Sequence, residues 1–133
     1  MFFGGLTAIH FTSHDIGYVV NVSGLIGKTT DGGNTWTQQH YLKADNVGAG
    51  DKFGISVAIS GDTAVIGASN YSSNKGKIYI YKRSGTAWNS EQTIEGEATD
   101  DYFGHSVSID SDTIAVSANE KGMDSMEVHY RII

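Results

Sequence analysis

The chain has 133 residues, 17 of them glycine, and no proline or cysteine. This length suits one domain with a modest core, and a composition rich in Gly, Ser, Thr, Val, Ile and Tyr favours short strands joined by glycine turns, an all-β class. The net charge of −6, with Lys and Arg scattered singly, excludes the basic surface that nucleic-acid binding needs, and the lack of cysteine excludes disulfides and thiolate metal sites.

The N-terminal segment MFFGGLTAIHFTSHD lacks both the basic start of a signal peptide and the long apolar run of a membrane span. We therefore expect no membrane partner. The chain is expected to be cytoplasmic, or else a processed, recombinant or excised piece of a longer protein. The absence of cysteine does not decide the compartment.

The first unit, residues 1–44, contains four candidate strands. In chain order they are LTAIHFT, IGYVVNVS, LIGKTT and TWTQQHYLKA. Their apolar and β-branched content, with Gly, Asp and Asn between them, is typical of an antiparallel meander.

The turn between the last two of these strands, TTDGGNTW, resembles the Asp-box or BNR-like repeat of sialidases and photosystem-assembly-type propellers, over about residues 6–39. The pattern S/T-x-D-x-G-x-T-W is satisfied by Thr29, Asp31, Gly33, Thr35 and Trp36. The resemblance implies structural roles: the carboxylate accepts backbone N–H groups, the glycines supply positive φ, and the tryptophan packs beneath the turn.

An internal repeat follows, because residues 53–68 align without gaps on residues 103–118. Eight of the sixteen aligned pairs are identical: Phe53/Phe103, Gly54/Gly104, Ser56/Ser106, Val57/Val107, Ile59/Ile109, Asp62/Asp112, Thr63/Thr113 and Ala68/Ala118. Within each copy, apolar residues alternate with small or polar ones, which predicts a strand with one face in a core. In the first copy this alternation places Ile55 on the apolar face with Val57.

The repeat predicts two further units, residues 45–96 and 97–133. The second unit has four strands, ending in one that begins at Trp88, and the third stops after MEVHYRII, one strand short. Trp36 and Trp88 occupy equivalent places in their units. Eleven strands in three meanders of about 50 residues match the size of propeller blades.

These two units resemble the FG-GAP repeat of integrin-α-like propellers, in its bacterial form. The motif residues are Phe53, Gly54, Gly67 and Ala68 in the first copy and Phe103, Gly104 and Ala118 in the second, where Ser117 replaces the usual glycine. The resemblance implies an extracellular or cell-surface origin. It also raises a calcium site between the first two strands of a blade, but Asp110 and Asp112 are few carboxylates, and we expect them to cap the turn and no metal or cofactor to bind.

No catalytic constellation is evident. The five histidines, at 10, 14, 40, 105 and 129, have no metal-binding spacing, and the arginine cluster of a sialidase cannot be built from Arg83 and Arg131. His105 replaces Ile55 and is expected either to line a central channel or blade interface or to bond a nearby backbone group. Aromatic side chains could form a glycan platform, but blade packing needs the same residues: Tyr71, Tyr79, Tyr81, Tyr102, Tyr130, Trp36 and Trp88.

Fewer than three complete blades do not close a propeller, which takes four to eight, and they leave apolar blade faces open. We therefore expect a non-catalytic scaffold or binding module that assembles with itself head to tail, a dimer giving about six blades. The alternatives are a fragment or recombined chain, and a glycan-binding or sialidase-like Asp-box protein.

Overall fold

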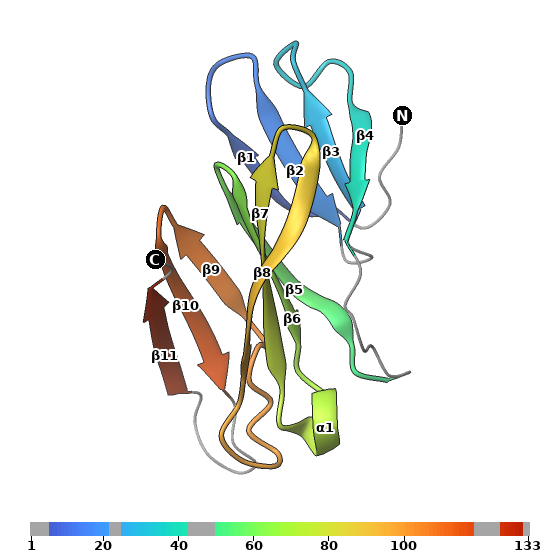
Figure 1. Ribbon diagram of the computed structural model, residues 1–133. Coiled ribbons are helices and arrows are strands. Elements are labelled where there is room, and N and C mark those ends of the chain that lie inside the picture. Colours follow the sequence, from blue (N-terminus) through green and yellow to red (C-terminus); the bar gives the residue numbers. More distant parts are fainter. Residues whose placement is uncertain (1–5, 22–24, 43–49, 119–125, 132–133) are drawn as a thin grey trace.

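The structure is a computed structural model that describes residues 6–21, 25–42, 50–118 and 126–131 (Figure 1). Its strands form three antiparallel sheets in which neighbours along the chain are hydrogen-bonded neighbours in the sheet. We name the sheets blade 1, blade 2 and blade 3 in chain order. The predicted all-β fold of antiparallel, four-stranded blades is confirmed.

The strands are as follows. Blade 1 consists of β1 (Leu6–Phe11), β2 (Gly17–Asn21), β3 (Leu25–Thr29) and β4 (Thr37–Tyr41). Blade 2 consists of β5 (Phe53–Ser60), β6 (Thr63–Ala68), β7 (Lys77–Ser84) and β8 (Ala87–Glu95). Blade 3 contains β9 (Val107–Asp110), β10 (Thr113–Ala118) and β11 (Met126–Arg131) among the described residues.

A single helical turn, α1 (Tyr71–Asn74), lies in the Ser- and Asn-rich segment that joins β6 to β7. Ser72 and Ser73 have positive φ, so this turn is not a regular helix. It is far too short to cross a membrane, and the described part of the chain holds no helix that is long and apolar enough to do so.

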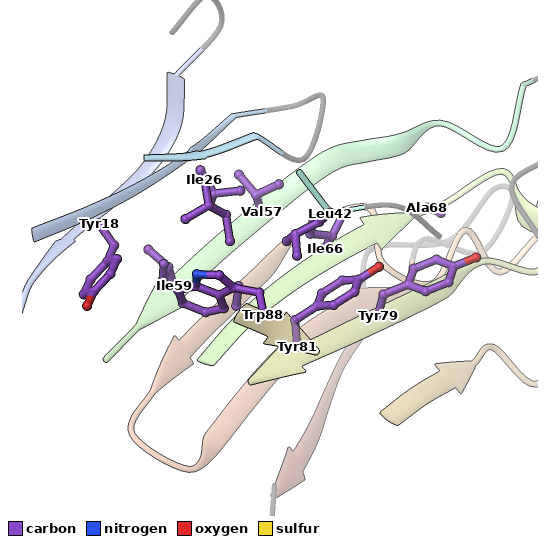
Figure 2. Close-up of a cluster of buried hydrophobic side chains, with 12 residues drawn as sticks. Tyr18, Ile26, Leu42, Val57, Ile59, Ile66, Ala68, Tyr79, Tyr81 and Trp88 are labelled. Carbon is purple, nitrogen blue, oxygen red and sulfur yellow. The ribbon is translucent and has the colours of Figure 1, made fainter. Parts of the chain in front are cut away.

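Blades 1 and 2 pack face to face through an apolar cluster (Figure 2). Tyr18, Val20 and Ile26 are its main contribution from blade 1, and all three are buried. The blade 2 members are Val57, Ile59, Ala64, Ile66, Ala68, Tyr79, Tyr81 and Trp88. Trp88 joins the two sheets twice, because its ring packs edge-on against Tyr18 at 5.8 Å and its Nε1 donates to Gln39 Oε1 at 2.8 Å.

The opposite face of blade 2 packs against blade 3. Val65, Ile78 and Ile80 alternate in their strands with the residues that face blade 1, and they pack against Phe103, Ile114 and Val116. Because successive strand residues point to opposite faces, the apolar runs TAVIGA and KIYIY fill both interfaces. Blade 2 is therefore buried on both sides.

The alternation predicted for residues 53–60 is correct at Val57 and Ile59 but wrong at Ile55, whose residue is 40% exposed. The pairing of β5 with β6 shifts register between Phe53 and Ser56, and Gly54 has a φ of 95°. The shift gives β5 two more residues than β6 at this point, so Ile55 bulges outward, while Phe53, Val57 and Ile59 stay on the side of blade 1 and the buried Ser56 faces Gly104.

Candidate binding site

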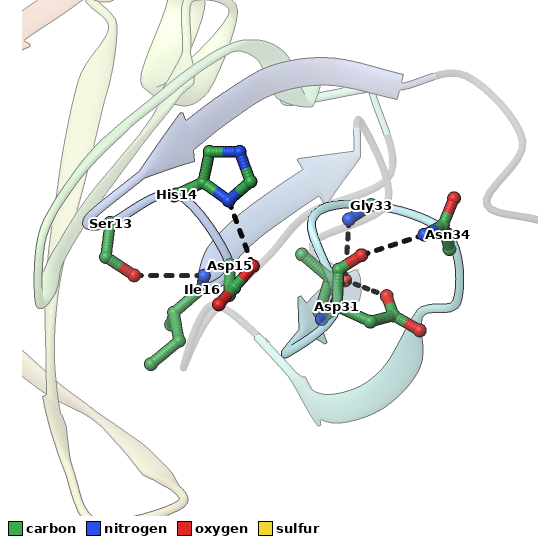
Figure 3. Close-up of polar contacts among 8 residues, drawn as sticks. Ser13, His14, Asp15, Ile16, Asp31, Gly33 and Asn34 are labelled. Atoms are coloured by element: carbon green, nitrogen blue, oxygen red, sulfur yellow. Dashed lines mark hydrogen bonds and ion pairs between the residues drawn. The ribbon is translucent and has the colours of Figure 1, made fainter.

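The Asp31 hairpin follows β3 and is held by its own side chains (Figure 3). The Asp31 carboxylate accepts the Thr35 hydroxyl at 2.6 Å, the Thr35 N–H at 2.9 Å and the Thr29 hydroxyl at 2.8 Å. These bonds, the Thr35 hydroxyl first among them, lower the pKa of Asp31 from 3.8 to about 2. The carboxylate is therefore ionised and bonded within its own turn.

The other motif residues of this hairpin close the same turn. Gly33 has a φ of 97°, and its N–H donates to Thr29 Oγ1 at 2.9 Å. Trp36 Nε1 donates to the Gly33 carbonyl at 3.0 Å, and its ring packs edge-on against Phe11. The structure thus brings Thr29, Asp31, Gly33, Thr35 and Trp36 together, with every described bond serving the turn.

The two Phe-Gly segments form the same backbone turn. Positive φ occurs at Gly50, Lys52 and Gly54 and again fifty residues later at Asp100, Tyr102 and Gly104. In both turns an N–H bonds back to the carbonyl three residues earlier, from Ile55 to Lys52 at 3.0 Å and from His105 to Tyr102 at 3.1 Å. We call these the first and second FG turns.

The second FG turn is anchored on blade 2. The buried Ser56 hydroxyl donates to the Gly104 carbonyl at 2.7 Å, and Phe103 pairs with Gly76 in a parallel bridge. A Cβ added to Gly67 would lie 2.0 Å from Gly104 O, so only glycine admits this approach. Ala68 is buried against blade 1, and Ala118 packs at the edge of the cluster between blades 2 and 3.

A cavity of about 310 Å³ opens between the two FG turns. Its described lining residues are Lys52, Ile55, Ser69, Asn70, Tyr102 and His105. Ser69 is fully buried and its hydroxyl donates to Asn70 Oδ1 at 3.0 Å. Asn70 in turn donates its N–H to the Asp51 carbonyl at 3.1 Å, which fixes the floor between the turns.

Of these residues the sequence singled out Ile55, His105 and, as part of a possible glycan platform, Tyr102, and it missed Lys52, Ser69 and Asn70. Lys52 could have been found, because the repeat aligns it with Tyr102 and the two residues differ just before the identical Phe-Gly pair. Ser69 and Asn70 lie just beyond the aligned segment. His105 is exposed and lines this cavity at the junction of two blades.

Other candidate groups are not gathered into a site. Within the described residues no group of three or more His, Asp or Glu could hold a metal ion. The Asp112 carboxylate accepts the Thr113 hydroxyl at 3.3 Å in the turn between β9 and β10. Arg83 donates from Nε to Asp62 Oδ1 at 2.9 Å and from Nη1 to the Gly85 carbonyl at 2.7 Å.

Several of the aromatic residues considered for a glycan platform pack inside the protein. Tyr79, Tyr81 and Trp88 are buried in the contact between blades 1 and 2, so they do not form an open platform. Trp36 and Trp88 differ in environment although they are equivalent in sequence, since Trp36 is half-buried over the Asp31 hairpin. Tyr130 lies in β11, and its side chain is outside the described residues.

The fold and the repeats have counterparts among known proteins. A solved, propeller-like structure described as YCF48 bound to D1 peptide matches with a TM-score of 0.53 and 15% identity, over 92% of this chain and 39% of that chain. This chain therefore spans well under half of that chain's length, and the likeness concerns the fold alone. No curated protein gives a significant sequence match. A family model for the FG-GAP repeat matches residues 36–81 and 88–127, more than half of the sequence, and the chain therefore belongs to the FG-GAP repeat family.

Proposed function

We propose that the chain is a non-catalytic β-propeller module that acts as a binding scaffold and self-assembles head to tail, with a dimer favoured. The observation that carries the proposal is the difference in burial between the sheet faces of the blades. Blade 2 is buried on both sides, whereas the outer face of blade 1 leaves Ile9 58% and Phe11 38% exposed. Burying such a face against another sheet is favourable by about 25 cal/mol per Å² of apolar surface.

The open face of blade 3 would be the second half of the contact. On this face β9 and β10 carry small or polar residues, since Ser108 pairs with Ala115 and Ser117 is hydrogen-bonded to Ser106. An apolar face against a small and polar one gives a weaker contact than that between blades 2 and 3. We therefore expect dissociation in the micromolar range, about 8 kcal/mol of binding free energy.

Light scattering over a concentration series tests the assembly. The expected result is a rise from monomer to dimer mass, which Ile9→Asp abolishes because it places a charge in the contact. Ile55→Asp is the matched control, since it charges an exposed isoleucine outside the blade 1 face. A monomeric mass up to about 100 µM, well above the expected dissociation range, would contradict self-assembly, and so would an unchanged mass for Ile9→Asp.

We further propose that blade 1 is an Asp-box blade whose motif is structural. The internal bonds of the Asp31 carboxylate support this, because they use the charge to hold a turn. The engagement of Arg83 with Asp62 and Gly85 supports a role without catalysis. A fluorogenic sialoside assay is expected to show no hydrolysis. Hydrolysis that persists in Asp31→Asn would contradict the non-catalytic role and show that the activity does not depend on the Asp31 carboxylate.

A glycan-binding role is the second candidate, and Tyr102 in the cavity between the FG turns favours it, because an aromatic ring can stack on a sugar. A glycan array probed with the purified protein tests it. Binding that Tyr102→Ala removes would support a lectin, and a flat array would eliminate that role.

A further inference from the structure

The cavity between the FG turns is built by the repeat itself. Lys52 and Ile55 come from the first turn, and Tyr102 and His105 come from the same two places in the second. Each pair lies on a turn with matching positive φ and a matching backbone bond. The walls are therefore fixed by backbone geometry that does not depend on the identity of the four side chains.

The two turns are identical where they build the frame and different where they line the cavity. Phe53/Phe103, Gly54/Gly104, Ser56/Ser106 and Val57/Val107 are the identical pairs in this segment. Between and before them, Lys52 is replaced by Tyr102 and Ile55 by His105. A fixed frame with divergent lining residues is how repeat proteins form ligand surfaces.

The described lining of the cavity is basic, whereas the chain as a whole is acidic. Although acidic residues outnumber Lys and Arg by 15 to 9, none of the described residues that line the cavity is acidic, and Lys52 and His105 are among them. Nearby acids serve the loops: Asp100 Oδ1 accepts Asn74 Nδ2 at 3.0 Å, and Asp101 Oδ2 accepts the Ala98 N–H at 2.9 Å. The cavity thus presents a cation and several hydrogen-bonding groups beside the exposed apolar surface of Ile55.

From this arrangement we infer that the cavity binds a small ligand with a carboxylate and a short apolar body. The Lys52 ammonium pairs with the carboxylate, the Asn70 amide and Tyr102 hydroxyl supply further polar contacts, and Ile55 packs against the body. About 310 Å³ accommodates a molecule of this size. The inference rests on the binding role proposed above but not on self-assembly, because all the lining residues belong to one chain.

The test is a two-dimensional amide NMR titration of the full chain at low salt. The probes are 3-methylbutanoate, as a free small acid, and N-acetylvaline, as the end of a peptide, with the amide of each as its uncharged control. We expect saturable shifts at residues 52, 55, 70, 102 and 105 with the acids, at millimolar affinity, and about fivefold weaker binding for the amides. The acid that binds more tightly identifies the source of the carboxylate.

Variants separate this site from adventitious surface binding. Lys52→Gln removes the charge and leaves a polar side chain one atom shorter, and it is expected to weaken acid binding about fivefold. His105→Ile removes a hydrogen-bonding ring from the lining and introduces the residue of the first turn, and the same weakening is expected. Lys82→Gln, at a lysine outside the cavity, is expected to leave binding unchanged. Any of three results would overturn the inference: equal binding of acids and amides, unchanged affinity in both cavity variants, or no saturable shift at 20 mM. This ligand concentration is about tenfold above a low-millimolar dissociation constant. Light scattering on the same samples reports self-assembly independently, so the two proposals can fail separately.

Discussion

Replacing Gly67 with alanine adds a methyl group at a point where the second FG turn lies directly against blade 2. The added Cβ would lie 2.0 Å from the Gly104 carbonyl oxygen and 2.4 Å from Ser56 Oγ, whereas ordinary contacts are 3.4–4 Å. Both neighbours are held in place, because Gly104 O is backbone and Ser56 Oγ is bonded to it. The second FG turn must therefore move away from blade 2.

The cost has two parts. Overpacking a tight interior contact destabilises by about 1–3 kcal/mol. Breaking the buried bond from Ser56 to Gly104 leaves polar groups without a partner and costs about 1–3 kcal/mol more. The expected loss is about 2–6 kcal/mol, which at about 3–4 °C per kcal/mol for a chain of this size lowers Tm by roughly 6–24 °C.

Urea unfolding followed by circular dichroism measures this loss. Ser117→Ala is the matched control, since residue 117 occupies the place of Gly67 in blade 3 and already carries a Cβ. Its hydroxyl accepts the Ser106 N–H in an exposed bond, so the substitution is expected to change stability by less than about 1 kcal/mol. If Gly67→Ala also stays within 1 kcal/mol of the parent, the close contact is not what requires glycine.

Three more outcomes are expected. Because its pKa is lowered to about 2, Asp31 stabilises the fold above pH 4 and this contribution is lost as the pH falls from about 4 to 2; urea midpoints should drop over that range, and less so in Asp31→Asn. Ser56→Ala should cost about 1–2 kcal/mol and Ser106→Ala less than 0.5, a difference that equal urea midpoints would contradict. Trp88→Phe should cost about 1–2 kcal/mol by the same assay, and adding Gln39→Ala should cost little more because both remove one bond, so fully additive losses would argue against that bond.

Strand order could be predicted because it depends on local patterns. The apolar runs of β6 and β7, the period of two in β5 and the glycine turns each mark a strand within a few residues. The repeat then places the third blade by analogy with the second. Ile55 could not be placed correctly, since the two extra residues of β5 between Phe53 and Ser56 form a bulge that the unbroken alternation of apolar residues does not reveal.

The environments of Trp36 and Trp88 show a second limit. Both begin the last part of a blade, but Trp36 lies before β4 and packs against its hairpin, whereas Trp88 lies inside β8 and faces blade 1. The cavity is a third case, because it exists only when two turns fifty residues apart are docked by Ser56 and Gly76. Sequence spacing predicts the turns but not the space between them.

The position of blade 2 between its neighbours has a consequence for how the chain unfolds. Blades 1 and 3 are joined mainly through blade 2, so stability passes along the chain as a series of nearest-neighbour couplings. Blades 1 and 3, each held on one face, are then expected to open before blade 2 and to exchange their amide hydrogens faster. The amides of blade 2 should exchange only when its contacts with both blade 1 and blade 3 are broken.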